Sequence, residues 1–367
     1  LLAGLGGVLV FIPQIALLFF LISILEEIGY MSRAAFLFDR IMQLFGMNGR
    51  SMVALISGGA CAIPAIMSTR TISSWKERLI TILVTPFTTC SARLPVYAII
   101  IALVIPDERV FGIINMQGLT LMLLYLLGFG MAIFSAYILN TILKIKGKTY
   151  FVVEMPNYKL PMFKNVAINV IEKTKAFIFG AGKIILAISI VLWFLASYGP
   201  GDKFRNAEKI VLEKNLEKPL NTAELQNAIA SQKLENSYIG LMGKTIEPVI
   251  SPLGYDWKIG VAIISSFAAR EVFVGTLATI YSVGDSDNDN TIKNKMQAEI
   301  NPETGQKIFN FASGISLLLF YAFAMQCAST IAITKKETNS WKWPLGQLIF
   351  MSGLAYVVAL IAFQILK

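Results

Sequence analysis

Long apolar runs without a charged residue constrain this chain more than any other feature of its sequence. They cover approximately residues 8–25, 110–143, 184–201, 308–334 and 343–366, and the run 79–105 has Arg93 as its only charge. About 18 such residues allow an α-helix to cross about 30 Å of hydrocarbon. With 55% hydrophobic and 15% charged residues, the chain is too apolar for a soluble protein of its size. The sequence therefore predicts an all-α polytopic membrane protein.

Basic residues between the apolar runs indicate how the chain is oriented. From Lys144 to Lys183 there are eight lysines against two glutamates, and the positive-inside rule places this connector in the cytoplasm. The net charge of +9 is distributed as juxtamembrane anchors. The expected partner is therefore the lipid bilayer, and no nucleic acid is expected. The acidic segment 284–308 and the nearly balanced segment 200–256 are expected to be external loops.

The order of the segments divides the chain into four expected parts. These are a first repeat at 1–110, a returning helix and basic connector at 111–182, a second repeat at 183–335, and a C-terminal transmembrane helix at 336–367. In the first repeat, a helix precedes a short segment, 51–67, and a broken helix, 79–105. The short segment has basic residues on both flanks, so we expect it to be re-entrant from the cytoplasm.

The second repeat aligns with the first. The aligned stretches are 45–57 with 253–265 and 86–92 with 323–329. This alignment puts Cys327 at the position of Cys90, and Glu271 at the position of Ile63, close to Cys61. The first helix of each repeat is expected to run in the opposite direction from the other. We therefore predict an inverted repeat of broken and re-entrant helices, as in many secondary transporters with a substrate site at the midplane.

Each of the three cysteines, Cys61, Cys90 and Cys327, lies at an interruption of an apolar run. Thiolates bind borderline and soft divalent metals, and broken helices free backbone carbonyls that can join them. Because the chain has no histidine, a metal would have to use sulfur, carboxylate or carbonyl ligands. Free cysteine is also among the most buried residue types, so packing alone stays an alternative. The pattern favours metal handled within the membrane.

Several residues at the same interruptions are expected to gate or support the site. They are Gly58, Gly59 and Pro64 beside Cys61; Pro86, Ser91, Arg93 and Pro95 around Cys90; and the thioethers of Met67 and Met325. Pro86 and Pro95 are both expected to disturb the broken helix. Arg93 either favours the Cys90 thiolate or binds the carbonyls freed by Pro95.

Arg270 and Glu271 are adjacent charges inside the apolar run 259–283. Facing lipid, each would cost about 2.5–3.5 kcal/mol, so both are expected to face protein or water. Glu271 is predicted as a charged partner of the metal, with Arg270 in a gate pair. An internal ion pair is the alternative.

The blocks 27–36, 61–67, 90–97, 254–262 and 268–272 resemble signatures of the ferrous iron transport protein B (FeoB) family, and the resemblance covers essentially the whole chain. It implies a multi-pass transporter that moves Fe²⁺ inward across the bacterial cytoplasmic (inner) membrane. It also implies an N-terminal GTPase domain, absent from this sequence, through which alone GTP would act, so the chain itself is not expected to be an enzyme. Small cytoplasmic accessory proteins and a homo-oligomer are further implied partners.

The sequence departs from the family pattern at two positions. Ala60 stands where glycine is usual before the first cysteine, and Gln326 where proline is common before the last. The second change is expected to leave the helix at Cys327 straighter. Two other functions remain open. One is an organic-solute or nucleoside carrier that shares the Gate repeat, named after the family's Gate motifs, which are the blocks at Cys61 and Cys90. The other is a membrane signalling or scaffold protein. A solute carrier would need aromatic and amide groups at the breaks, and none is placed there.

Overall fold

The computed structural model describes residues 2–110, 114–143, 158–200, 204, 206–214, 222–267, 270, 272–280, 307–325 and 327–367. Their regular structure is helical, apart from the antiparallel pair β1 (Arg109–Val110) and β2 (Ile114–Asn115). Within these residues, four helical segments are long and apolar enough to cross a membrane, namely Trp75–Val104, Met116–Ile142, Phe311–Thr338 and Lys342–Leu366. The prediction of an all-α polytopic membrane protein is confirmed.

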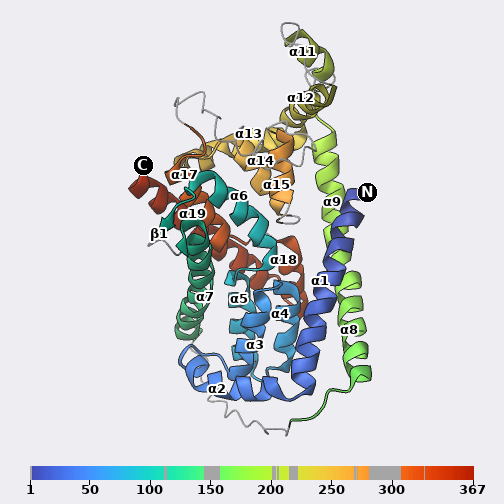
Figure 1. The fold of residues 1–367 in the computed structure, drawn as a ribbon, viewed down its shortest axis with the longest axis vertical. Helices are drawn as coiled ribbons and strands as arrows, with labels where there is room; N and C mark the ends of the chain where they lie inside the picture. The colour runs from blue at the N-terminus through green and yellow to red at the C-terminus, as the bar shows by residue number, and fades with distance from the viewer. Residues whose placement is uncertain are drawn as a thin grey trace. The chain divides into compact units, whose positions relative to one another are not determined.

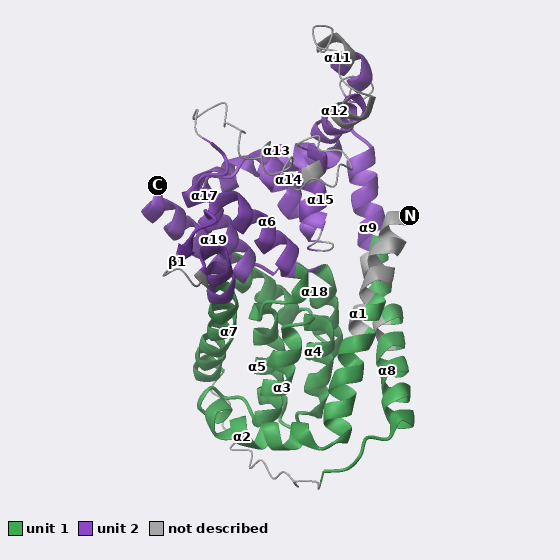
Figure 2. Ribbon diagram, in the orientation of Figure 1, with its two compact units in different colours: residues 1–92, 124–187, 328–352 green, residues 93–123, 188–327, 353–367 purple. Residues whose placement is uncertain are grey.

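The chain forms two compact units, which Figure 2 distinguishes by colour. Unit 1 contains residues 1–92, 124–187 and 328–352, and unit 2 contains residues 93–123, 188–327 and 353–367. The helices α7 (Met116–Ile142), α9 (Lys183–Ser197) and α19 (Lys342–Leu366) contribute to both units. The units are therefore interleaved along the chain, whereas the four parts expected from the sequence are consecutive.

Short helical pieces follow the long first helix of unit 1 (Figure 1). Besides the three shared helices, unit 1 contains α1 (Leu2–Glu27), α2 (Tyr30–Leu44), α3 (Gly49–Gly58), α4 (Ala62–Ser68), η1 (Thr69–Thr71), α5 (Trp75–Val84), η2 (Thr85–Phe87), α8 (Phe163–Phe177), η4 (Ile178–Gly182) and α18 (Ala328–Thr338). At ten and seven residues, α3 and α4 are each too short to span a bilayer. Arg50 in α3 donates to the Thr71 carbonyl beyond α4 at 2.6 Å. Both ends of this segment therefore lie together, as a re-entrant hairpin requires.

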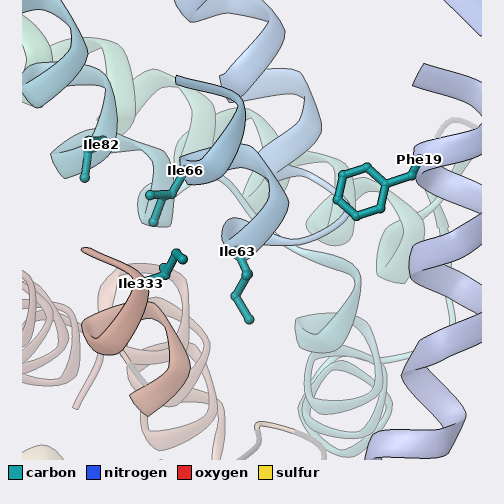
Figure 3. Packing of buried hydrophobic residues seen from close by; sticks show 5 residues of the cluster. All are labelled: Phe19, Ile63, Ile66, Ile82 and Ile333. Atoms are coloured by element: carbon teal, nitrogen blue, oxygen red, sulfur yellow. The ribbon is translucent and has the colours of Figure 1, made fainter. Parts of the chain in front are cut away.

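An apolar cluster holds the hairpin of unit 1 against its neighbours. Ile63 and Ile66 of α4 pack with Ile82 of α5 and Ile333 of α18, and Phe19 reaches toward them from α1 (Figure 3). All five side chains are at most 9% exposed. Burying such side chains fills the space between the helices within the bilayer.

Pro86 interrupts the helix that begins with α5, and a buried glutamine compensates for the interruption. In a regular helix the Ile82 carbonyl would accept from residue 86, but proline has no N–H. Gln347 of α19, only 4% exposed, donates to the carbonyls of Ile82 at 3.3 Å and Leu83 at 2.8 Å. Its amide oxygen accepts from Thr334 of α18 at 3.4 Å. One side chain therefore joins three helices.

Unit 2 contains a second set of short helices. Its elements are α6 (Leu94–Val104), α11 (Ala207–Lys214), α12 (Thr222–Glu235), α13 (Tyr238–Ile250), η5 (Ser251–Leu253), α14 (Trp257–Ser266), α15 (Val272–Ile280) and α17 (Phe311–Phe323). The segment 200–256, expected as a loop, thus contains three helices, and α13 packs on α14 through Ile239 and Val261. Of the expected loop 284–308, only residues 307 and 308 lie within the described residues.

The same local geometry occurs in both units at the register predicted from the sequence. Before α3, Asp39 accepts from the Gly49 N–H at 2.8 Å; before α14, Glu247 accepts from the Trp257 N–H at 3.2 Å. The aligned glycines Gly46 and Gly254 both have left-handed backbone conformations, with φ of 75° and 79°. The aligned residues Asn48 and Asp256 both cap the helix that follows. Three equivalent features at one spacing support the internal repeat.

We expect Gln347→Leu to destabilise unit 1, because it leaves the Ile82 and Leu83 carbonyls buried without a donor. The loss should be about 1–3 kcal/mol in the free energy of unfolding, measured on the purified protein in detergent. Gln364→Leu, at an exposed position on the same helix, is the matched control and should change little. Equal stability of both variants would show that Gln347 does not support the break at Pro86.

Candidate functional site

Two interruptions of unit 1 lie side by side and carry two of the cysteines. Cys61 immediately precedes α4, after a turn at Gly59 and Ala60. The Ala60 carbonyl would accept from residue 64 in a regular helix, but that residue is Pro64. Ser91 takes its place: the Ser91 N–H and hydroxyl donate to this carbonyl at 3.3 and 2.9 Å. The bond joins the segment of Cys61 to the segment of Cys90, one residue before Ser91.

Glycines allow the two interruptions to approach closely. A Cβ atom on Gly58 would lie 2.4 Å from the Thr88 hydroxyl oxygen. A Cβ atom on Gly128 of α7 would lie 2.8 Å from the Thr89 hydroxyl oxygen and 3.0 Å from the Phe87 carbonyl. Gly59 is the C-cap of α3. Small residues are therefore needed at positions 58 and 128 so that the backbone and hydroxyl groups of neighbouring segments can come this close together.

The surroundings of the cysteines in unit 1 are partly apolar. Cys61 and Met67 pack against the cluster of Phe19 and Ile63, and the side chains of Cys61 and Cys90 are both partly buried. Thiol and thioether sulfur thus border the same hairpin, with the Ala60 carbonyl nearby. This arrangement offers soft sulfur ligands to a divalent cation, whereas the Ala60 carbonyl already accepts two hydrogen bonds.

Unit 2 contains the second pair of interruptions. There, α17 ends at Phe323, and Met325 and Cys327 are not helical; α18 of unit 1 begins directly afterwards, at Ala328. Arg270, 6% exposed, directs Nη2 to the Ala324 carbonyl at 3.4 Å. This contact brings the stretch after α14 next to the stretch that carries Cys327. Glu271 and Gln326 lie outside the described residues.

Two expectations about the breaks are wrong. The chain is not helical at Cys327, although Gln326 replaces the usual proline: Ala324 has extended backbone, with ψ of 141°, and its carbonyl is bound by Arg270 rather than within a helix. Pro95 does not disturb a helix, because it lies in the first turn of α6, where proline needs no N–H partner. Arg93, which precedes α6, is fully buried.

The structure groups the predicted residues into two sets. Unit 1 contains Cys61, Cys90, Ser91, Gly58, Gly59, Pro64, Met67 and Pro86, and unit 2 contains Cys327, Met325, Arg270, Arg93 and Pro95. Among the residues that the structure describes, no group of three Cys, Asp or Glu side chains is suited to hold a metal.

The sequence reasoning missed Gln347 and Glu337 as buried polar residues of unit 1. Gln347 is an amide within the charge-free run 343–366, and Glu337 is a carboxylate next to the run 308–334. Their position beside hydrocarbon-length segments was a usable signal, because polar groups at that depth need specific partners. Their partners Ile82, Leu83, Arg70 and Arg78, more than 250 residues away in the chain, had no signal of that kind.

We expect Gly58→Ala to separate the two interruptions of unit 1, because the new methyl group overlaps the Thr88 hydroxyl. Overpacking of this kind costs about 1–3 kcal/mol and should lower the melting temperature of the purified protein. In the matched control, Gly130→Ala on α7, the new methyl has nothing within 4 Å and should be neutral. A neutral Gly58→Ala would mean that the close approach is not required.

Comparison with known protein families gives two matches. The Gate family, described as nucleoside recognition, matches residues 8–104 and 178–341. The family described as ferrous iron transport protein B C terminus matches residues 121–173. The Gate match alone extends over more than half of the chain. No solved structure matches this chain.

Curated relatives align with nearly the whole chain. Proteins named Fe(2+) transporter FeoB are 46% identical over 362 residues in Leptospira interrogans and 36% identical over 365 residues in Staphylococcus aureus. Each alignment covers 99% of this chain, and 49% and 48% of the respective relatives. A protein of Porphyromonas gingivalis, named as a fusion of Fe(2+) transport protein A and FeoB, is 37% identical over 99% of this chain and 43% of its own length.

The chain thus spans about half the length of the curated relatives it matches. The helical structure with its paired breaks agrees with the membrane-protein family that both matches indicate. The chain therefore belongs to the FeoB family of multi-pass bacterial inner-membrane proteins, and corresponds to the membrane part that carries the Gate and FeoB C-terminal regions.

Proposed function

We propose that this chain forms the membrane path by which ferrous iron enters the bacterial cytoplasm. The observation that carries the proposal is the pair of hydrogen bonds from Ser91 to the Ala60 carbonyl, which joins the segments of Cys61 and Cys90. The names of the curated relatives, Fe(2+) transporter FeoB, support Fe²⁺ as the transported substrate. In this proposal the chain itself catalyses no reaction.

Fe²⁺ would move between ligands rather than stay at one site. In unit 1, the Cys61 and Cys90 thiolates would act with nearby carbonyl oxygens, and Met67 would offer a thioether. In unit 2, Cys327 and Met325 would serve in the same way, with Glu271 as the charged partner and Arg270 as a gate residue. Thiolates exchange Fe²⁺ more readily when few of them act at once, which conduction requires.

Energy and regulation would come from partners. We infer that an N-terminal GTPase domain of the natural protein uses GTP to control the path. The Porphyromonas gingivalis relative, by its name a fusion with Fe(2+) transport protein A, supports a small accessory protein as a further partner. A nucleoside or other organic solute is a weaker candidate substrate, because small and hydroxyl residues predominate at the breaks of unit 1 and Phe87, an aromatic residue there, is fully buried.

We expect Cys61→Ser and Cys90→Ser each to reduce iron uptake at least about tenfold, because serine keeps most of the volume but is a poor ligand for a borderline metal. Uptake of radioactive Fe²⁺ should be measured in cells without other ferrous importers, with Cys327→Ser tested in parallel. Membrane abundance and melting temperature of every variant serve as controls for folding. Normal uptake by the triple serine variant would assign all three cysteines to packing.

The proposed inverted repeat makes a prediction about topology. Single-site tags or reporter cysteines within 70–78 and 144–182 should react only from the cytoplasm, because these segments carry the basic residues. Reporters within 200–256 and 284–308 should react only from outside. Labelling by a membrane-impermeant reagent in intact cells and in inside-out vesicles measures both. External labelling of 70–78 would exclude the re-entrant hairpin and the inversion.

A further inference from the structure

A carboxylate lies buried between two arginines at the end of α18. The Glu337 side chain is 3% exposed. It accepts from Arg70, with Nε 3.0 Å from both carboxylate oxygens and Nη2 2.6 Å from Oε1. Arg78 Nη2 donates to the other oxygen, Oε2, at 2.6 Å. Charge-assisted hydrogen bonds of this length are strong and fix the geometry of the groups they join.

The three residues come from segments that each adjoin one of the cysteines. Arg70 lies in η1, directly after the helix α4 that follows Cys61. Arg78 lies in α5, which leads to the break before Cys90, and Glu337 lies in α18, which begins one residue after Cys327. All three residues belong to unit 1. One carboxylate therefore joins three helical pieces, at the ends of these pieces that lie away from the cysteines.

The closed arrangement of this cluster, in which both arginines bind Glu337, depends on the negative charge of the carboxylate. Two guanidinium groups share a single carboxylate, so loss of the carboxylate charge leaves two like charges facing each other. The hydrogen bond with Glu337 raises the pKa of Arg70 above its usual value. The Arg70 side chain is 51% exposed, against 21% for Arg78. Arg70 can therefore exchange Glu337 for water more easily than Arg78 can.

A pocket of about 340 Å³ lies on the same hairpin. The residues of α4 and η1 that line it are Pro64, Met67, Ser68 and Thr71, and Thr71 is adjacent to Arg70. Arg50, which is hydrogen-bonded to the Thr71 carbonyl, lines it as well. Ser57 and Pro64, on either side of Cys61 in the chain, line the pocket too, so movement of η1 would change a pocket that reaches the segment of Cys61.

We propose that Glu337, Arg70 and Arg78 form an ionic latch that closes the route from the cytoplasm to Cys61, with Glu337 as a positioning residue for transport. The assignment of the latch to a transport path rests on the proposed function. When Arg70 leaves Glu337, the hairpin is released from α5 and α18. The pocket then opens toward the cysteine.

The latch is tested by how fast Cys61 reacts from the cytoplasmic side. For the assay, Cys90→Ser and Cys327→Ser are introduced into the natural full-length protein, which is placed in inside-out vesicles. It is then treated with a charged methanethiosulfonate, and modification of Cys61 is followed by mass spectrometry. We expect Glu337→Gln and Arg78→Gln to raise the rate about tenfold, by shifting the population toward the open arrangement. The control Lys336→Gln removes a charge at the adjacent, exposed position and should leave the rate unchanged.

A second variant keeps the test decisive if Glu337→Gln does not fold. Arg70→Lys retains the charge but loses the two-nitrogen contact with the carboxylate, and should raise the rate by a smaller factor, about threefold. Unchanged rates in folded variants would overturn the latch and leave the cluster as a static support. An equal rise in Lys336→Gln would also overturn it. Because the assay uses no iron, failure of the cysteines as ligands would not affect its result.

Discussion

A backbone carbonyl that loses its helical donor inside a bilayer must find another donor, and this requirement governs how the present fold is built. Water is not available there, so each unsatisfied group costs several kcal/mol. Pro64 deprives the Ala60 carbonyl of its donor, and Ser91 supplies two. Pro86 does the same to the Ile82 carbonyl, and Gln347 compensates. Each proline break is thus tied to a polar side chain of another segment.

This requirement explains why the breaks occur side by side. A broken helix facing lipid would leave its carbonyls unbonded, whereas a break facing another break can use that segment's donors. Unit 1 follows this arrangement through Ser91, and unit 2 follows it through Arg270 and the Ala324 carbonyl. Pairing of breaks also brings sulfur and carbonyl groups to one place. We propose that the arrangement that satisfies the backbone also lets a divalent cation pass from one ligand to the next.

Local features of the sequence predicted much of this structure. The charge-free runs, the breaks near Cys61 and Cys90 and the repeat register all depend on neighbouring residues, and each has a direct counterpart. The helices α11 and α12 were missed because their polar segments lack a strong apolar period, whereas α13 is amphipathic and carried a usable signal. The break at Cys327 was underestimated because it forms without proline. The contacts of Gln347 and Glu337 join residues 265 and 267 positions apart. Only the tertiary fold selects such partners.

The central claim is that thiolates at the paired breaks bind the transported ferrous ion. X-ray absorption at the iron edge of the anaerobic, Fe²⁺-loaded full-length protein tests it most directly. The account predicts a sulfur neighbour at about 2.3 Å, the length of thiolate bonds in comparable zinc sites, which disappears in the Cys61→Ser, Cys90→Ser double variant. A shell of oxygen and nitrogen alone, identical in the two proteins, would contradict the account.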